Sequence, residues 1–319
     1  MPRIASLNIL GEAAGKEYLA ELYGKVIENV QKNLISAPMK NTELSGDPVS
    51  GSVEAKRFAN ATPKAYGTAR TAGKGDAVKA KSVTVAIDSD KEIVEELEEK
   101  DVRLVGVDGV LERRAANHVL RMAAELDRAF FTAAAGSASA VNLSAFKTVG
   151  DKLEAIIQEC ETTQNDFVDG VPRSMMNVVC SPKWYGEIRK EIDKETHNAN
   201  INTDAEEFNV YHGVRVSSCV HLPVNVDCVL MVTGAVAQPV MANQYNAEKI
   251  PLSNAWGVEL FYHYGTKVVT PDLIFKPGTF TKASAFESGK QYYTLADGVY
   301  TACENLSAFD QGTDYYTMA

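Results

Sequence analysis

The sequence predicts an α+β protein, in which helices and strands occupy separate stretches of the chain. Residues 11–35 and 108–135 carry apolar residues at helical spacing, whereas residues 49–88 and 256–264 alternate apolar with polar residues as strands do. Between them, residues 145–240 alternate short helices with short strands. The three patterns together predict a helical and β-hairpin framework with an inserted α/β lobe.

The composition is that of a folded globular protein, since 45% of the 319 residues are hydrophobic and 23% are charged. It excludes a disordered chain, a collagen and a disulfide scaffold. No apolar run approaches the roughly 20 residues that cross a bilayer, so no membrane partner is expected. The first residues contain no secretory signal, and five irregularly spaced cysteines indicate a reducing compartment. A net charge of −10 argues against wrapping of nucleic acid by the whole chain.

The first predicted elements are an amphipathic helix and a long β-hairpin. Apolar residues at spacings of three and four form one stripe of the helix, which Pro38 ends: Leu19, Leu22, Val26, Val30 and Leu34. Residues 82–87 alternate polar with apolar side chains, and a weaker alternation covers residues 49–58. These two strands predict a hairpin whose tip spans residues 59–79.

Two adjacent blocks of opposite charge follow. Residues 55–82 contain seven basic residues against Asp76 alone: Lys56, Arg57, Lys64, Arg70, Lys74, Lys79 and Lys81. A loop with so few large hydrophobic residues at its centre cannot fold on its own contacts, so it is disordered or ordered by a partner. Residues 88–101 contain eight acidic and two basic residues, among them Glu92, Glu95, Glu96, Glu98 and Glu99. Consecutive carboxylates form a solvated helix face or a docking surface, and the neighbouring basic loop favours docking.

The strongest helical pattern covers residues 108–135, which at 1.5 Å per residue gives a helix of about 40 Å. In the lobe that follows we expect helices at residues 150–161 and from Ser181-Pro182, where Ser caps the helix and Pro takes its first position. Strands are predicted at residues 175–180, 214–216 and 229–232, and the chain then returns to a sheet at residues 256–264.

The last forty residues contain a repeat. The frame Phe-x-x-Gly-x-x-Tyr-Tyr-Thr begins at Phe286 and again at Phe309, an offset of 23 residues. Asp297-Gly298 lies between two short β-prone runs, which is a strong signal for a two-residue hairpin turn. The repeat therefore predicts a small β appendage.

The signatures of common enzymes are missing from the sequence. Residues 67–75 come nearest to a phosphate-binding loop, but five residues instead of four separate the glycines, and Gly75 follows Lys74 where Ser or Thr would bind Mg²⁺. A nucleophilic pair could be composed of Cys160 or Cys180 with a distant histidine, yet nothing singles one out. We expect no catalytic residue and no cofactor.

Histidines and cysteines have a structural interpretation as well as a chemical one. Four of them within 17 residues could bind zinc: His212, Cys219, His221 and Cys228. Their spacing fits no compact zinc knuckle, and Cys219 and His221 alternate about Val220 as on one face of a strand. Packing is therefore favoured over a metal site. His118 falls on the apolar stripe of the long helix, which predicts a buried, hydrogen-bonded histidine.

The order of these elements resembles that of the major capsid protein family of tailed bacteriophages, and some short sequence segments are also similar. The fold of this family is shared by encapsulins and the herpesvirus capsid floor. The similar segments are the return strand ending in residues 264–271, Leu-Glu-Arg-Arg-Ala-Ala at residues 111–116 with Glu-Leu-Asp at 125–127, and Gly-Val-Arg-Val at 213–216 before Leu222-Pro223. The resemblance covers about residues 1–278.

The resemblance implies a division of the chain into five parts. Residues 1–45 would be an N-arm with its amphipathic helix, and 46–90 an extended loop that lies across a neighbouring subunit. Residues 91–145 and 240–280 would form a peripheral domain with the long spine helix, 146–239 an axial domain, and 281–319 the β appendage. The basic loop and the acidic region would then meet between subunits.

The implied function is that of a non-enzymatic shell protein. It would self-assemble as hexamers and pentamers into the icosahedral head of a virion in the host bacterial cytoplasm, enclosing double-stranded DNA without sequence-specific contact. A portal and a separate scaffold protein would be its partners, because 45 residues before the loop leave no room for a fused scaffold. Within the same fold the alternative is an encapsulin-type nanocompartment. The alternative from another class of protein is a soluble α/β enzyme that uses a Cys/His site in residues 160–228.

Overall fold

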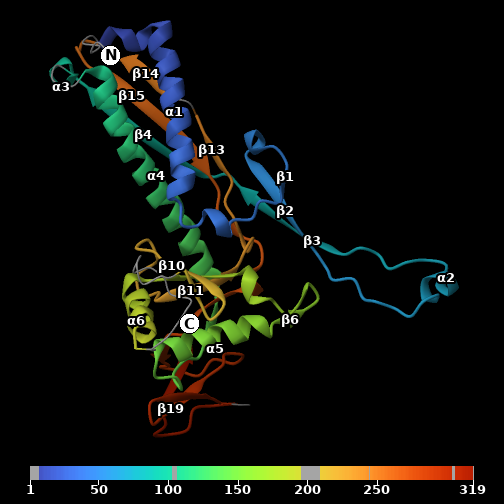
Figure 1. Cartoon of the computed structure of the whole chain (residues 1–319). Coiled ribbons are helices and arrows are strands. Elements are labelled where there is room, and N and C mark those ends of the chain that lie inside the picture. Colours follow the sequence, from blue (N-terminus) through green and yellow to red (C-terminus); the bar gives the residue numbers. More distant parts are fainter. Residues whose placement is uncertain (1–6, 103–105, 195–208, 244, 304–305, 319) are drawn as a thin grey trace. The chain divides into compact units, whose positions relative to one another are not determined.

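The computed structural model describes residues 7–102, 106–194, 209–243, 245–303 and 306–318. The start of the predicted N-arm lies outside these residues. By its internal packing the chain divides into two compact units. Unit 1 consists of residues 1–55, 82–130 and 237–267, and unit 2 of residues 56–81, 131–236 and 268–319. Figure 1 labels elements of both units where there is room.

Unit 1 contains two long helices and a sheet. The helices are α1 (Ala13–Asn33) and α4 (Val107–Ser137), of which residues 107–130 belong to this unit. At the centre of the sheet β15 (Trp256–Tyr264) pairs antiparallel with β4 (Ser89–Leu97) along one edge. Its other edge carries β13 (Val240–Ala242) and β14 (Asn246–Lys249). The predicted stripes of both helices are buried in one core with the inward face of β15.

Asp127 on α4 fixes the turn that follows α1. The Asp127 carboxylate is 2% exposed and accepts hydrogen bonds from the Ile35 and Ser36 backbone N–H groups, both at 3.1 Å, and from Ser36 Oγ at 2.7 Å. A buried carboxylate is tolerated where donors surround it in this way. The end of α1 is thereby tied to the spine helix.

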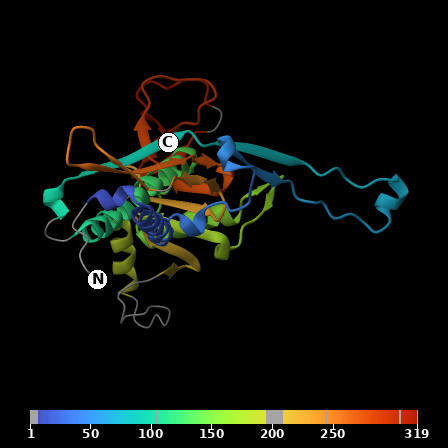
Figure 2. The ribbon, with the colours of Figure 1, turned by 90° about the horizontal axis from the view of Figure 1, so that it is seen from above.

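The predicted hairpin is present. It consists of β2 (Ser52–Phe58) and β3 (Ala80–Ala86), with β1 (Leu44–Ser45) on the other side of β2. Figures 1 and 2 show it as a long arm that ends in the short helix α2 (Thr68–Ala72). Gly67 and Gly73 flank α2 in the left-handed conformation, which glycine adopts without steric cost.

Unit 2 contains the α/β lobe, built on a six-stranded sheet in the order β5-β17-β11-β8-β10-β9. Its central strands β8 (Met176–Cys180) and β11 (Cys228–Val232) are fully buried and antiparallel, and β10 (Val214–Ser218) is parallel to β8. Helices α5 (Val149–Glu161) and α6 (Pro182–Ile192) pack on one face of this sheet, and the Ser181 side chain caps α6 as predicted.

The C-terminal repeat forms a four-stranded sheet in the order β18-β21-β19-β20, and Asp297-Gly298 makes the predicted turn between β19 and β20. In each copy the backbone N–H after the Phe donates to the hydroxyl of the first Tyr: Glu287 N to Tyr292 at 2.7 Å and Asp310 N to Tyr315 at 3.4 Å. The aromatic rings of the two copies pack against one another. The repeat is thus a self-packing β unit.

The remaining elements are short helices and strands, some of which belong to the sheets above. They are η1 (Leu7–Gly11), η2 (Ala37–Met39), η3 (Pro48–Ser50), α3 (Glu99–Val102), β5 (Ser139–Val141), β6 (Gln164–Asn165), β7 (Val168–Asp169), η4 (Arg173–Met175), β9 (Val210–Tyr211), β12 (Val236–Ala237), β16 (Lys267–Val268), η5 (Pro271–Leu273), β17 (Ile274–Pro277), β18 (Phe280–Lys282), β19 (Tyr293–Ala296), β20 (Val299–Ala302) and β21 (Tyr315–Met318).

The acidic run at residues 89–97 forms the strand β4, whose alternate residues Ile93, Glu95 and Leu97 turn toward the core. One local prediction is wrong. Strand β10 ends at Ser218, so Cys219 and His221 lie in the turn beyond it and do not alternate on a sheet. Turn geometry buries Cys219 and leaves Val220 73% exposed.

Candidate functional site

The extended loop is held at its base by a bidentate ion pair. Arg57, at the end of β2, donates from Nη1 and Nη2 to the two Asp272 carboxylate oxygens at 2.6 and 2.7 Å. Asn165 Nδ2 donates to the same carboxylate at 2.6 Å, and the Arg57 guanidinium lies 4.5 Å from the centre of the Phe167 ring. Planar fork geometry and a cation–π contact make this a strong anchor.

Backbone contacts reinforce the same base. Asn60 N donates to Asp166 O at 2.9 Å, and Ala59 N donates across the hairpin to Lys79 O at 2.9 Å. Burial by itself would raise the pKa of Asp272, but the hydrogen bonds from Arg57 and Asn165 hold it below its ordinary value. The carboxylate therefore stays charged and paired at neutral pH.

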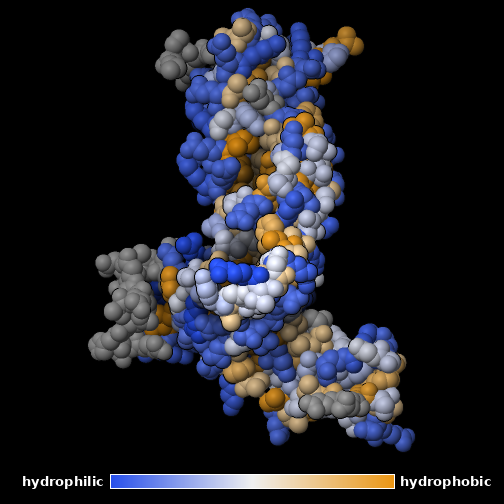
Figure 3. All heavy atoms as spheres, turned by 90° about the vertical axis from the view of Figure 1, so that its right-hand side faces the viewer, coloured by the Kyte–Doolittle hydropathy of each residue, from blue (hydrophilic) through white to orange (hydrophobic). Residues whose placement is uncertain are grey.

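Beyond this base the loop is exposed along its whole length. Nearly every residue between 61 and 81 is exposed, including the side chains of Lys64, Arg70, Lys74, Lys79 and Lys81. Two large apolar side chains share this exposure: Tyr66 is 97% exposed and Val78 is 82% exposed. Figure 3 shows one face of the molecule, on which hydrophobic residues form patches among hydrophilic ones. The tip is a surface with positive charge and isolated apolar groups.

The acidic residues of β4 divide between two faces of the strand. Glu92 and Glu96 point outward and are exposed, as are Glu98 and Glu99 just after the strand. Among the described residues β4 pairs with β15 along one edge, and its outward carboxylates are exposed within unit 1. Charged side chains are typical of sheet edges, since they discourage unwanted strand pairing.

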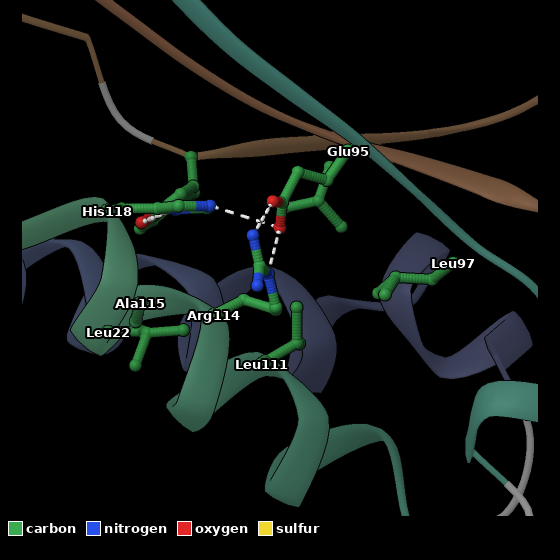
Figure 4. A pocket seen from close by; sticks show the side chains of 9 residues that line it. Leu22, Glu95, Leu97, Leu111, Arg114, Ala115 and His118 are labelled. Atoms are coloured by element: carbon green, nitrogen blue, oxygen red, sulfur yellow. Dashed lines mark hydrogen bonds and ion pairs between the residues drawn. The ribbon is translucent and has the colours of Figure 1, made fainter. Parts of the chain in front are cut away.

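Glu95 differs from its neighbours because it takes part in a network inside unit 1. Arg114 on α4 donates from Nε to Glu95 at 2.7 Å and makes a second contact through Nη2. His118, one turn further along α4, places Nε2 3.1 Å from Glu95 and Nδ1 2.7 Å from the Tyr245 hydroxyl. Figure 4 shows both α4 side chains directed at the Glu95 carboxylate.

The network sets the charge state of its members. Hydrogen bonding from Arg114 lowers the pKa of Glu95, while burial lowers the pKa of His118 in spite of the nearby carboxylate. His118 is 3% exposed, so the prediction of a buried, hydrogen-bonded histidine is confirmed. Glu95 and Arg114 are charged and His118 is neutral at pH 7.

The structure thus separates the predicted contact residues into exposed and internally used groups. Arg57 and Glu95 have partners within their own units, and the contact role of all these residues stays a prediction. Lys64 pairs with Asp76 in the tip and Glu98 with Lys100, both in exposed positions. Sequence reasoning missed Asp272, Asn165 and Phe167, since the anchor joins residues far apart in the chain and no local pattern marks them.

Among the residues considered for metal or nucleophile chemistry, Cys180 and Cys228 lie opposite each other on the neighbouring strands β8 and β11. Within the described part of the chain, no group of three or more His, Cys, Asp or Glu side chains is arranged to hold a metal ion. His212 Nδ1 lies 3.0 Å from a carboxylate oxygen of Glu154. The same carboxylate also forms an ion pair with Arg173. Burial raises the pKa of the Cys160 thiol to about 12, far from that of an activated nucleophile. Among the described helices none is long and apolar enough to cross a membrane.

No protein-family model and no curated protein matches the sequence. Solved structures do match. The chain is similar to a Mycobacterium phage Che8 structure (TM-score 0.57, 19% identity, 76% of this chain and 90% of that one) and to the capsid of Ralstonia phage GP4 (0.54, 14%, 74% and 85%). It is also similar to a virus-like particle from Pyrococcus furiosus (0.53, 12%, 82% and 99%). The chain therefore has the fold of tailed-phage major capsid proteins, as the sequence predicted.

Proposed function

We propose that this chain is a major capsid protein that assembles into the icosahedral head of a tailed bacteriophage. The observation that carries the proposal is the fold, which the chain shares over about three quarters of its length with the capsid of Ralstonia phage GP4 and the Che8 structure. Fold alone does not define function, so the surface features must agree with it.

The extended loop supports assembly. It has a fixed base and a basic tip that rests on few contacts of its own, and such a segment gains order when a partner covers it. The outward carboxylates of β4 and its following turn offer the complementary charge. Each exposed ion pair contributes at most about 1 kcal/mol, but a closed symmetric shell repeats every contact many times.

On this proposal the contact pairs the exposed loop lysines and Arg70 of one subunit with Glu92, Glu96, Glu98 and Glu99 of the next. The five-part division into N-arm, extended loop, peripheral domain, axial domain and appendage belongs to the same proposal. So do hexamers and pentamers, a separate scaffold protein, a portal, packaged double-stranded DNA and assembly in the host cytoplasm. No catalytic activity is required of the shell subunit.

Negative-stain electron microscopy tests the proposal. The protein is expressed alone and together with the products of its neighbouring genes, and particles are isolated by size exclusion. Closed shells, or rings of five and six subunits, are the expected result. A clean monomer in both preparations would contradict the proposal and return attention to the α/β enzyme, which predicts an activity lost on cysteine alkylation.

The encapsulin-type nanocompartment is a second candidate because the chain matches the Pyrococcus furiosus virus-like particle over 82% of its own length and 99% of that chain. The contents of purified particles separate the two. A phage head is expected to contain double-stranded DNA that resists nuclease, whereas a nanocompartment is expected to contain a cargo enzyme and no genome.

A further inference from the structure

Two cysteines of the α/β lobe lie opposite each other on neighbouring strands. Cys180 ends β8 and Cys228 begins β11, and the antiparallel register pairs them directly. Both are 0% exposed and belong to the same core cluster, so their side chains point to the same face of the sheet. Their thiols are close enough to interact, and this contact, after burial, raises the pKa of Cys228.

The hydrogen bonds around the pair define which kind of cross-strand site it occupies. Ser181 N donates to Asp227 O at 2.7 Å and Thr233 N donates to Met175 O at 2.9 Å, so these flanking positions are hydrogen-bonded pairs. Pairs alternate along an antiparallel ladder, which makes Cys180 and Cys228 a non-hydrogen-bonded pair. Consistently, the Cys180 carbonyl points away from β11 and accepts from Cys219 N at 2.9 Å.

Non-hydrogen-bonded positions bring opposite side chains closest, with Cα atoms about 4.5 Å apart. That separation lies inside the range of about 4.4–6.8 Å that a disulfide spans without backbone movement. We propose that Cys180 and Cys228 are a modification site, a dithiol that closes to a cross-strand disulfide when a low-molecular-weight disulfide is present. The proposal concerns unit 2 alone and does not depend on the shell function.

The reaction is thiol–disulfide exchange. One cysteine thiolate attacks oxidised glutathione, which forms a mixed disulfide and releases one glutathione thiol. The second cysteine then attacks the protein sulfur of the mixed disulfide and releases the second glutathione, so two protein thiols are oxidised as one glutathione disulfide is reduced. Both thiols are fully buried in the closed lobe, so exchange proceeds through local opening of the strands.

The test uses the full-length protein in glutathione buffers with urea below the unfolding midpoint, incubated until the thiol count is constant. Acid stops the exchange, and free thiols are then alkylated with excess N-ethylmaleimide near neutral pH in denaturant and mapped by mass spectrometry. We expect Cys180 and Cys228 to lose alkylation together, at a concentration of oxidised glutathione at least tenfold below that which modifies Cys160 or Cys303. We also expect a disulfide-linked peptide that contains both residues. The proposal would be overturned if Cys180 and Cys228 both remained alkylated when Cys303 already carries glutathione. It would also be overturned if either of them formed a disulfide with another cysteine.

A stability readout accompanies the mapping. The disulfide would close a long loop and restrict the unfolded chain, so the oxidised protein should show a higher urea midpoint that falls back on reduction. Cys160→Ala removes another fully buried thiol of the same core and is expected to retain this redox-dependent shift. Cys228→Ala is expected to lose it. An equal shift in Cys228→Ala would overturn the assignment.

Discussion

Arg57 and Asp272 lie 215 positions apart in the chain and form a bidentate ion pair with N–O distances of 2.6 and 2.7 Å. The pair is largely shielded from solvent, since the Arg57 side chain is 13% exposed and that of Asp272 is 31% exposed. It connects the end of β2, where the exposed part of the loop begins, to η5 of the same unit. The loop therefore begins at a fixed point, although its tip has few contacts.

Replacing Arg57 by Lys should loosen the base of the loop. Lysine keeps the charge but cannot make the parallel hydrogen bonds or the planar contact with Phe167, so we expect unfolding to become easier by about 2 kcal/mol. Urea denaturation measures the loss, and limited proteolysis between residues 58 and 80 should speed up. Arg70→Lys, at the exposed tip, is the matched control; equal effects of the two substitutions would contradict the anchor.

Removing the Asp127 carboxylate should destabilise unit 1 strongly. Asp127→Ala would leave two backbone N–H groups and the Ser36 hydroxyl without their acceptor in a buried position, at a cost of about 3 kcal/mol. Ser36→Ala removes one of the three hydrogen bonds and should cost about 1 kcal/mol. Thermal unfolding ranks the two variants, and a Ser36→Ala loss as large as that of Asp127→Ala would refute this account.

Local patterns predicted the elements but not the contacts between them. The stripe from Leu19 to Leu34 and the Ser181-Pro182 start give the positions of α1 and α6 because capping and periodicity are local properties. The Arg57–Asp272 pair and the Glu95–His118 contact join separate elements, so nothing near either residue marks them. The strand β4 was not predicted, because its run of glutamates hides the inward alternation of Ile93, Glu95 and Leu97.

Reversing the charge of the loop tip should block assembly without unfolding the subunit. Lys74, Lys79 and Lys81 are exposed, so their replacement by Glu leaves the core intact while it sets like charges against the proposed acidic partner. Sedimentation is expected to show soluble subunits and at least tenfold fewer shells. Adding Glu92→Lys and Glu96→Lys should restore part of the yield; unimpaired shells in the loop variant would rule out docking by charge.

Mild acid should destabilise unit 1 through His118. Its pKa is lowered by burial, so below the ordinary histidine value of about 6.5 the unfolded chain takes up the proton first and the folded state loses stability. Glu95, whose pKa is lowered, loses its contribution only as the pH falls below about 4.5. Between these two pH values the change in folding stability therefore reflects protonation of His118.

His118→Gln is expected to flatten the fall in unfolding free energy between pH 6.5 and 5, a change of about 1 kcal/mol. Urea titrations at several pH values provide the measurement. His263→Gln serves as the control, because His263 pairs with the exposed Asp90 on the surface of the sheet. If the slope survives in His118→Gln and vanishes in the control, the assignment to His118 is wrong.

At alkaline pH the folding stability should depend on the protonation of Lys40. This residue lines a groove of about 460 Å³ in unit 1 together with Tyr23, Met122 and Gln238. Burial lowers the pKa of Lys40 to about 8, although the Asp127 charge opposes the shift. Between pH 8 and about 10.5 the unfolded chain holds a proton that the folded chain has lost, so stability rises with pH over this window.

Lys40→Met should abolish that rise and raise the unfolding free energy at pH 7 by about 2 kcal/mol, since an uncharged chain of similar length suits the groove better. The difference between the wild-type and variant urea midpoints, measured from pH 7 to 10.5, isolates this residue from tyrosines that titrate in the same range. We expect the difference to shrink steadily above pH 8. A constant difference across the range would mean that Lys40 is not the titrating group.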